Sequence, residues 1–355
     1  MALFATVAML LAAGVYNDAA APPSPTAYEA RMATLDGGPD GAGGPQVALA
    51  GPRVAIGSHH VLDEAAARFH PVDGGASFSA NASGMRDATA TGDVFAWVEG
   101  GGPPSVHIRD FARGTSTSVA VPEGLEPVAG HLIVSDSLAV WPIPSNDVWR
   151  VAGFVRADLA PREFDIPLPG NLTPLAAVGW DLFLAQPAED DRLWLYNAST
   201  QLLRQVAEGD GVQEVSAGGF FAAWVNRSVP QAEYLDLASG RVESIPGPAG
   251  VRAQWVRASP TAVLVGGLRG GLFGDSPSAW HYDFPTGDAQ VYSDLGVELD
   301  GAVVFGLADR TVVAVSSRPL PREAAPLTPH LLAAGLGGML VTVYLGTRDA
   351  LQGQD

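Results

Sequence analysis

The sequence predicts an all-β fold: a seven-bladed β-propeller whose last blade is closed by an N-terminal strand, followed by a C-terminal transmembrane helix. Three observations predict it: an apolar motif that recurs about every 42 residues, an excess of turn-forming residues, and an apolar run near the C-terminus. Glycine (42) and proline (28) together supply 70 of the 355 residues, whereas charged residues supply only 16%. Abundant turn residues with few charges favour many short strands over helices.

The repeated motif consists of three apolar residues followed by Trp, Gly or Ala. Its seven copies end at Gly57, Trp97, Trp141, Ala185, Trp224, Gly266 and Gly306, at intervals of 39 to 44 residues. In most copies a tight turn precedes the motif, and the strand after it ends in a second turn, such as DLASG at residues 236–240. An Asp or Asn side chain can cap such a turn, and Gly takes its left-handed position. Each unit therefore predicts four antiparallel strands, with the length of a propeller blade.

The motif also predicts how the blades pack and how the ring closes. We expect it at the end of each second strand, where its Trp, Gly or Ala would pack between neighbouring blades. The seventh unit reaches the sequence PLPREAAP without a fourth strand, whereas residues 26–35 are strand-like and precede the first unit. We expect this N-terminal segment to be the outer strand of the last blade, because ring closure removes an exposed sheet edge.

These repeats resemble the TolB-like (PD40-type) β-propeller repeats. The segments FAWV…IRDFARG, LFLA…LYNASTQ and AAWV…YLDLASG carry the resemblance best, and it covers roughly residues 45–316. The resemblance implies a propeller of the exported or periplasmic kind that mostly serves binding and scaffolding. The chain has no accompanying hydrolase domain and lacks the WD40 signature.

The two ends of the chain predict export and anchoring. Residues 2–15 are almost all apolar, too few to span a bilayer, and small residues follow at 19–21, as in a secretory signal. A buried helix or an uncleaved anchor remain alternatives. The predicted segments are a signal peptide (1–21), a leader (22–44), the propeller (45–318), a linker (319–328), a transmembrane helix (329–346) and a tail (347–355). This arrangement predicts a single-pass protein of the cell membrane with an extracellular propeller.

Composition excludes several classes of chemistry. The chain has no cysteine and no lysine, so its 20 basic residues are all arginine, against 38 acidic residues. Disulfides, thiol nucleophiles and Cys-ligated metals are excluded, as are Walker A loops and Schiff-base enzymes. The net charge of −18 argues against a nucleic-acid partner, which requires a basic surface. The acid excess fits either a solubilising surface or a compositional preference for Arg over Lys.

Polar residues on the predicted channel-lining strands form a first group of candidate binding residues. They are Arg86, Asp87, His131, Gln213, Glu214, Arg252, Gln254 and Glu298. Converging polar groups could bind a small polar ligand, although a merely water-filled channel gives the same pattern.

Loops between second and third strands form a second group. His59, His60 and Asp63 are candidate metal ligands, and Glu189, Asp190 and Asp191 form a possible cation patch. The longest loop, residues 267–278, carries Leu268, Leu272 and Phe273 among glycines, which suggests a partner contact. A solvated loop is the alternative in each case. No cofactor is predicted beyond a possible divalent cation.

Two functions remain open from the sequence. The first is a non-catalytic binding or scaffolding module at the cell surface, with a protein or glycan partner on the loop face. The second is an exported glycan hydrolase or lyase that uses a carboxylate pair at the channel mouth, such as Asp87 with Glu214 or Glu298. No catalytic motif such as G-x-S-x-G or H-E-x-x-H is present, which favours the first function.

Overall fold

The structure is a computed structural model, and every regular element that it describes is a β-strand. The described residues are 26–34, 47–50, 53–80, 84–128, 130–145, 148–186, 192–207, 212–226, 231–270, 275–287, 289–292, 304–308, 311–319, 330–336 and 339–345. Contacts divide the chain into one unit of residues 28–317 and a second unit of residues 1–27 and 318–355.

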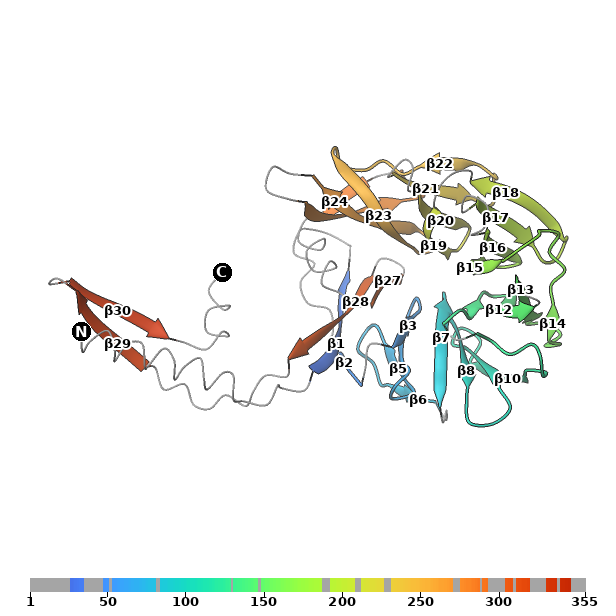
Figure 1. The fold of residues 1–355 in the computed structure, drawn as a ribbon, viewed down its shortest axis with the longest axis horizontal. Helices are drawn as coiled ribbons and strands as arrows, with labels where there is room; N and C mark the ends of the chain where they lie inside the picture. The colour runs from blue at the N-terminus through green and yellow to red at the C-terminus, as the bar shows by residue number, and fades with distance from the viewer. Residues whose placement is uncertain are drawn as a thin grey trace. The chain divides into compact units, whose positions relative to one another are not determined.

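Six sheets are each built from four consecutive antiparallel strands, and we call them blades 1 to 6 (Figure 1). Blade 1 has β3 (Val54–Ile56), β4 (His60–Asp63), β5 (Arg68–Pro71) and β6 (Phe78–Ser79). Blade 2 has β7 (Met85–Thr91), β8 (Val94–Glu99), β9 (Ser105–Asp110) and β10 (Thr115–Ala120). Blade 3 has β11 (Ile133–Val134), β12 (Leu138–Ser145), β13 (Val148–Val155) and β14 (Arg162–Glu163).

The second half of the run continues in the same way. Blade 4 has β15 (Thr173–Val178), β16 (Asp181–Gln186), β17 (Arg192–Asn197) and β18 (Leu202–Ala207). Blade 5 has β19 (Val212–Gly218), β20 (Phe221–Asn226), β21 (Gln231–Asp236) and β22 (Val242–Ser244). Blade 6 has β23 (Val251–Ala258), β24 (Ala262–Arg269), β25 (Ser276–Asp283) and β26 (Ala289–Tyr292).

One further four-stranded sheet joins the two ends of the propeller, and we call it the closing sheet. Its order is β2 (Val47–Leu49), β1 (Thr26–Thr34), β28 (Thr311–Pro319) and β27 (Val304–Ala308). The first strands of the six blades, here called inner strands, contact one another in sequence, and β27 contacts both β23 and β3. The inner strands and β27 therefore form a closed ring, and the fold is an all-β propeller.

The predicted fold class is wrong in its blade count and in its C-terminal helix. The run of blades made from consecutive strands has six members rather than seven, because the remaining sheet takes two strands from each end of the chain. For the same reason the segment expected as the outer strand, β1, lies second from the edge, with β2 outside it.

The C-terminal apolar run forms strands instead of the expected transmembrane helix at 329–346. β29 (His330–Leu336) and β30 (Met339–Leu345) pair antiparallel. In the sequence, Gly337 and Gly338 divide the run, and glycine disfavours a helix interior, whereas the segment LVTVY that follows is rich in residues that favour strands. Across the described residues, no helix has the length and apolar character needed to cross a membrane. The predicted signal peptide lies outside the described residues.

The apolar motif packs between blades, as expected for its tryptophans. Trp141 is fully buried in a cluster shared by blades 2 and 3, and Trp224 in a cluster shared by blades 4 and 5. At Gly266 the ring of Trp255 occupies the place of a side chain, because a Cβ there would lie 1.8 Å from that ring. The copies that end at Gly57 and Gly306 differ, since they lie on the inner strand β3 and on β27 of the closing sheet and not on second strands.

The turns between third and fourth strands, here called outer turns, form as predicted. Oδ1 of Asp110 accepts the N–H of Arg113 at 2.9 Å, and Oδ1 of Asn197 accepts the N–H of Thr200 at 2.9 Å. Gly114 and Gly240 have φ of 65° and 73°, the left-handed conformation that closes such turns.

Candidate functional site

A cavity of about 390 Å³ lies within the ring of inner strands. Residues of all six blades and of the closing sheet line it. They come from the last residues of the inner strands and from the turns that join inner and second strands, here called inner turns. We call the face that carries the inner and outer turns the turn face, and the opposite face the loop face. The cavity therefore belongs to the turn-face end of the channel.

The cavity wall is built mainly from small side chains and backbone. Glycine, alanine, serine and threonine predominate, and Asp136 and Arg257 are the charged residues of the lining. Arg257 is engaged with Glu214, whose Oε2 accepts from Nη1 at 2.5 Å. A wall of this kind offers hydroxyl and peptide groups to a ligand but no aromatic surface inside the channel.

Hydrogen bonds between neighbouring blades hold the inner turns in place. The Ser58 N–H donates to the Gly92 carbonyl at 2.7 Å, and the Ser135 hydroxyl donates to the Gly179 carbonyl at 2.6 Å. On the other side of the ring, Oγ of Ser216 accepts the Ala258 N–H at 2.9 Å. These bonds fix parts of the cavity rim, because they join blade 1 to blade 2, blade 3 to blade 4 and blade 5 to blade 6.

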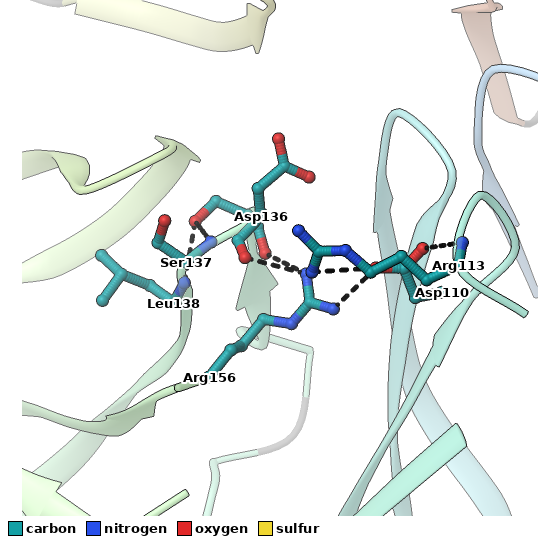
Figure 2. A network of polar contacts seen from close by, with 7 residues as sticks. Asp110, Arg113, Asp136, Ser137, Leu138 and Arg156 are labelled. Atoms are coloured by element: carbon teal, nitrogen blue, oxygen red, sulfur yellow. Dashed lines mark hydrogen bonds and ion pairs between the residues drawn. The ribbon is translucent and has the colours of Figure 1, made fainter. Parts of the chain in front are cut away.

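Figure 2 shows a charged network behind one of these turns. Arg156 donates to Oδ2 of Asp110 at 3.0 Å and to the carbonyls of Ser135 and Asp136 at 3.3 and 3.0 Å. It thereby ties blade 2 to the inner turn of blade 3. The Asp136 carboxylate points away from the arginine, toward the open side of the turn (Figure 2).

Exposed apolar side chains gather on the turn face of blades 4 and 5. Trp180 and Phe220 stand in the two inner turns, directly after the cavity-lining Gly179 and Gly219. Leu202 and Val242 begin the outer strands, directly after the outer turns. Their exposed fractions are 37% for Trp180, 70% for Leu202, 69% for Phe220 and 44% for Val242. We call these four residues the turn-face patch.

None of the predicted channel residues that the structure describes lines the cavity, and His131 precedes β11. Those that lie on inner strands, at the end away from the cavity, are Arg86, Asp87, Gln213, Glu214, Arg252 and Gln254. Asp87 and Glu214 both have positive φ, 54°, beside bulges in β7 and β19. Each reaches the following blade: Oδ1 of Asp87 accepts the Gly130 N–H at 2.7 Å, and Glu214 pairs with Arg257. The two carboxylates are therefore used separately as contacts between blades. The cavity uses residues that follow them on the same strands, such as 88–92 and 216–219.

Other predicted binding residues have varied surroundings. Arg86 is exposed on β7, and His131 packs edge-on against Trp149. Arg252 and Leu268 lie opposite each other in blade 6, and Arg252 pairs with Asp275 at 2.8 Å. The structure thus brings together one predicted channel residue and one predicted loop residue. Gln254 is exposed on β23. The structure does not describe the remaining candidates, which are Leu272, Phe273, Glu298, residues 189–191 and the side chain of Gln213.

The predicted metal ligands of blade 1 have separate partners. Nδ1 of His59 lies 2.7 Å from Asp93, and His60 stacks on Phe111 with 3.8 Å between ring centroids. Both oxygens of the Asp63 side chain accept backbone N–H groups, at 2.9 Å from Ala50 and 3.1 Å from Ala65. Within the described ranges, no three His, Asp or Glu side chains are grouped as a metal site requires.

Sequence reasoning missed Trp180 and Phe220. The sequence carried a partial signal, since each is a large apolar residue directly after glycine in a tight turn. The repeated motif covers the residues that follow these turns, which are buried except for the half-buried Ala185 and Phe221, and it does not include the turns themselves.

Comparison with known proteins bears on the fold. No protein-family model and no curated protein matches the chain. The crystal structure of human WBSCR16 is similar with a TM-score of 0.53 and 10% identity, over 82% of this chain and 99% of that one. This likeness concerns the fold alone.

Two further solved structures extend the comparison. TolB from Acinetobacter baumannii is 10% identical with a TM-score of 0.41, over 82% of this chain. The resemblance to TolB-like propellers is one of fold. A chain of the Nidogen/Laminin complex is 11% identical with a TM-score of 0.39, over 82% of this chain and 98% of that one. The present chain spans 65% of the TolB chain's length.

Proposed function

We propose that this propeller is an exported, non-catalytic binding module that receives a partner protein on its turn face. The observation that carries the proposal is the turn-face patch, four exposed apolar side chains on two adjacent blades beside the channel cavity. Several exposed apolar side chains on one face are typical of protein contacts, and exposed aromatic residues are frequent anchors of such contacts.

The negative charge of the inner turns indicates which kind of partner protein fits the turn face. Among the described residues in or directly after the inner turns, the charged groups are Asp93, Asp136 and Asp181, with no arginine. The whole chain carries a net charge of −18. A partner with apolar anchors for Trp180 and Phe220 and with basic groups beside them is complementary to this surface.

The geometry offers less support for an enzyme. A glycosidase needs two carboxylates facing one substrate bond, and Asp87 and Glu214 instead each contact the following blade. The partly fixed rim and the cavity lined by small residues suit the immobilisation of a partner segment.

Export rests on the sequence of the N-terminus. The apolar run at 2–15 and the small residues at 19–21 support it. The chain also has four Asn-x-Ser/Thr glycosylation sequons, at Asn81, Asn171, Asn197 and Asn226. They support export less, because the Asn197 amide donates to Asp181 at 2.9 Å and the Asn171 carbonyl accepts the Trp149 N–H at 2.6 Å. Both side chains are thus structural. Fusion of residues 1–30 to a periplasmic reporter tests export, and reporter activity is expected.

The blade-six loop is a second candidate contact. Its end is fixed to the inner strand by the ion pair of Arg252 with Asp275. Replacing Leu272 and Phe273 with serine tests this surface independently of the turn face.

The direct test of the proposal compares the wild type with the double variant Trp180→Ser/Phe220→Ser as bait for envelope proteins. We expect one partner to be captured by the wild type and to be lost, by at least about tenfold, with the double variant. Val291→Ser, which removes an exposed apolar side chain of β26, is the matched control and should keep the partner. Equal capture by the double variant would contradict the proposal.

A further inference from the structure

Blade 1 leaves part of blade 2 uncovered. Its outer strand β6 has two residues, whereas β9 and β10 of blade 2 have six each. The buried side chains of β9, Val106 and Ile108, belong to the cluster shared with blade 3, so the alternate residues face blade 1. On that side Ser116 and Ser118 of β10 are exposed.

Arg109 is held in a fixed position on this uncovered face. Its guanidinium carbon lies 5.0 Å from the ring centroid of Phe78 and 5.1 Å from that of Phe111. Nη1 donates to Oγ of Ser116 at 3.0 Å. Two aromatic contacts orient the planar group and reduce the entropy lost when a ligand binds.

This arginine has no carboxylate partner within the described part of the chain. Arg150, Arg156 and Arg162, by contrast, each pair with an acidic residue. In a chain with 38 acidic residues against 20 arginines, an oriented guanidinium without such a partner is available to an external anion.

We propose that Arg109, Ser116 and Ser118 bind a tetrahedral oxyanion, a phosphate or sulfate group carried by a ligand. Nε of Arg109 is buried, and Nη1 donates both to Oγ of Ser116 and, at 3.4 Å, to the Gly114 carbonyl. The guanidinium therefore lacks two free parallel donors for a carboxylate. The oxygens of a tetrahedral group can instead accept one hydrogen bond from Nη2 and further hydrogen bonds from the hydroxyls of Ser116 and Ser118. These two hydroxyls belong to different positions on β10. The exposed Phe78 ring borders the site and offers an apolar contact to the rest of the ligand.

Glu99 limits the affinity of this site. Its Oε2 lies 2.5 Å from Nε2 of His107, and the same nitrogen is 3.5 Å from Oγ of Ser118. The carboxylate is therefore close enough to repel an anion, although His107 stands between them. Removing its charge should strengthen binding.

The test titrates the full chain with inorganic phosphate, inorganic sulfate and acetate, and follows the backbone amides of residues 116–118 by NMR. We expect saturable shifts with phosphate and sulfate and weaker shifts with acetate; the tighter of the two tetrahedral ions indicates the natural group. Arg109→Gln should weaken binding at least about tenfold. Glu99→Gln should strengthen it severalfold.

Two controls keep the test decisive. Arg241→Gln removes an exposed arginine of blade 5 and should leave binding unchanged. Ser116→Ala/Ser118→Ala retains Arg109 and its aromatic contacts, and should weaken binding even if Arg109→Gln does not fold. Three results would overturn the proposal. Acetate could bind as tightly as phosphate, Arg241→Gln could lose as much phosphate affinity as Arg109→Gln, or Ser116→Ala/Ser118→Ala could bind phosphate as tightly as the wild type. Because this site lies on blade 2, its failure leaves the turn-face proposal untouched.

Discussion

At the scale of single residues, the ion pair of Asp110 with Arg156 is a largely buried link between blades 2 and 3. The two side chains are 5% and 12% exposed. Burial alone would raise the pKa of Asp110, but the Arg113 N–H and the Arg156 guanidinium outweigh it, so the pKa lies below its ordinary value. The carboxylate is therefore charged and depends on its partners.

Loss of Arg156 should destabilise the fold. In Arg156→Gln the buried Asp110 charge loses its more buried partner but keeps the Arg113 guanidinium at 3.5 Å. The loss of stability should therefore be below the value of about 3–5 kcal/mol that an uncompensated buried charge costs. Urea unfolding of the variant measures this loss. Arg162→Gln, which breaks the exposed pair with Asp158, is the control and should leave the unfolding midpoint unchanged.

Two histidines of blade 1 should make stability depend on pH. Burial lowers the pKa of His60 and of His70 below the ordinary value of 6.5, and one ring nitrogen of each is buried without a partner. Below about pH 6.5 these histidines therefore bind more protons in the unfolded chain than in the folded protein. The folded protein should keep its full stability above that pH and lose stability as the pH falls from about 6.5 toward the lowered pKa values.

The measurement compares unfolding free energies at about pH 7.5 and about pH 5.5. The wild type should be less stable at the lower pH, and His60→Phe/His70→Phe should show a smaller difference between the two. An unchanged difference in the double variant would show that other groups cause the dependence.

At the scale of elements, the second strands hold the blades together. Each is apolar on both faces because it packs against two neighbouring blades, and this produces the repeated motif. The motif was therefore readable from sequence. The motif could not distinguish second strands from the strands that line the channel, since the latter can also present three apolar residues followed by Gly, as in the copies ending at Gly57 and Gly306.

A glycine of this motif gives a test of close packing. Gly266→Ala would place a Cβ 1.8 Å from the Trp255 ring, which must then move, and overpacking of this kind costs about 1–3 kcal/mol. Thermal unfolding should show a lower midpoint. Gly102→Ala, at a position with no atom within 4 Å of the new Cβ, should have the midpoint of the wild type.

At the scale of the whole molecule, closure joins two strands from each end of the chain. The period of the repeat indicated a ring of blades. It could not show how many strands each end of the chain contributes to the closing sheet, because the apolar β2 segment is equally compatible with the first strand of blade 1. The C-terminal apolar run was wrongly predicted to be a helix, because its apolar content indicates burial but not the type of secondary structure. The Gly337–Gly338 pair within the run disfavours a helix. The turn-face patch escaped prediction because exposure depends on the neighbours that the fold supplies.

Truncation tests closure. Removing residues 1–50 deletes β1 and β2 and leaves an unpaired edge on β28, so we expect a lower unfolding midpoint and aggregation. Removing residues 1–25 spares both strands and should leave the midpoint unchanged. Equal midpoints for the two truncations would contradict the role of the closing sheet.

The claim that the turn face binds a protein partner is tested most directly by site-specific photo-crosslinking in cells. A photoreactive amino acid at position 220, in the turn-face patch, should give a discrete crosslinked species, and the same group at position 102, in the loop between β8 and β9, should give none. Crosslinking at 102 with none at 220 would contradict the account.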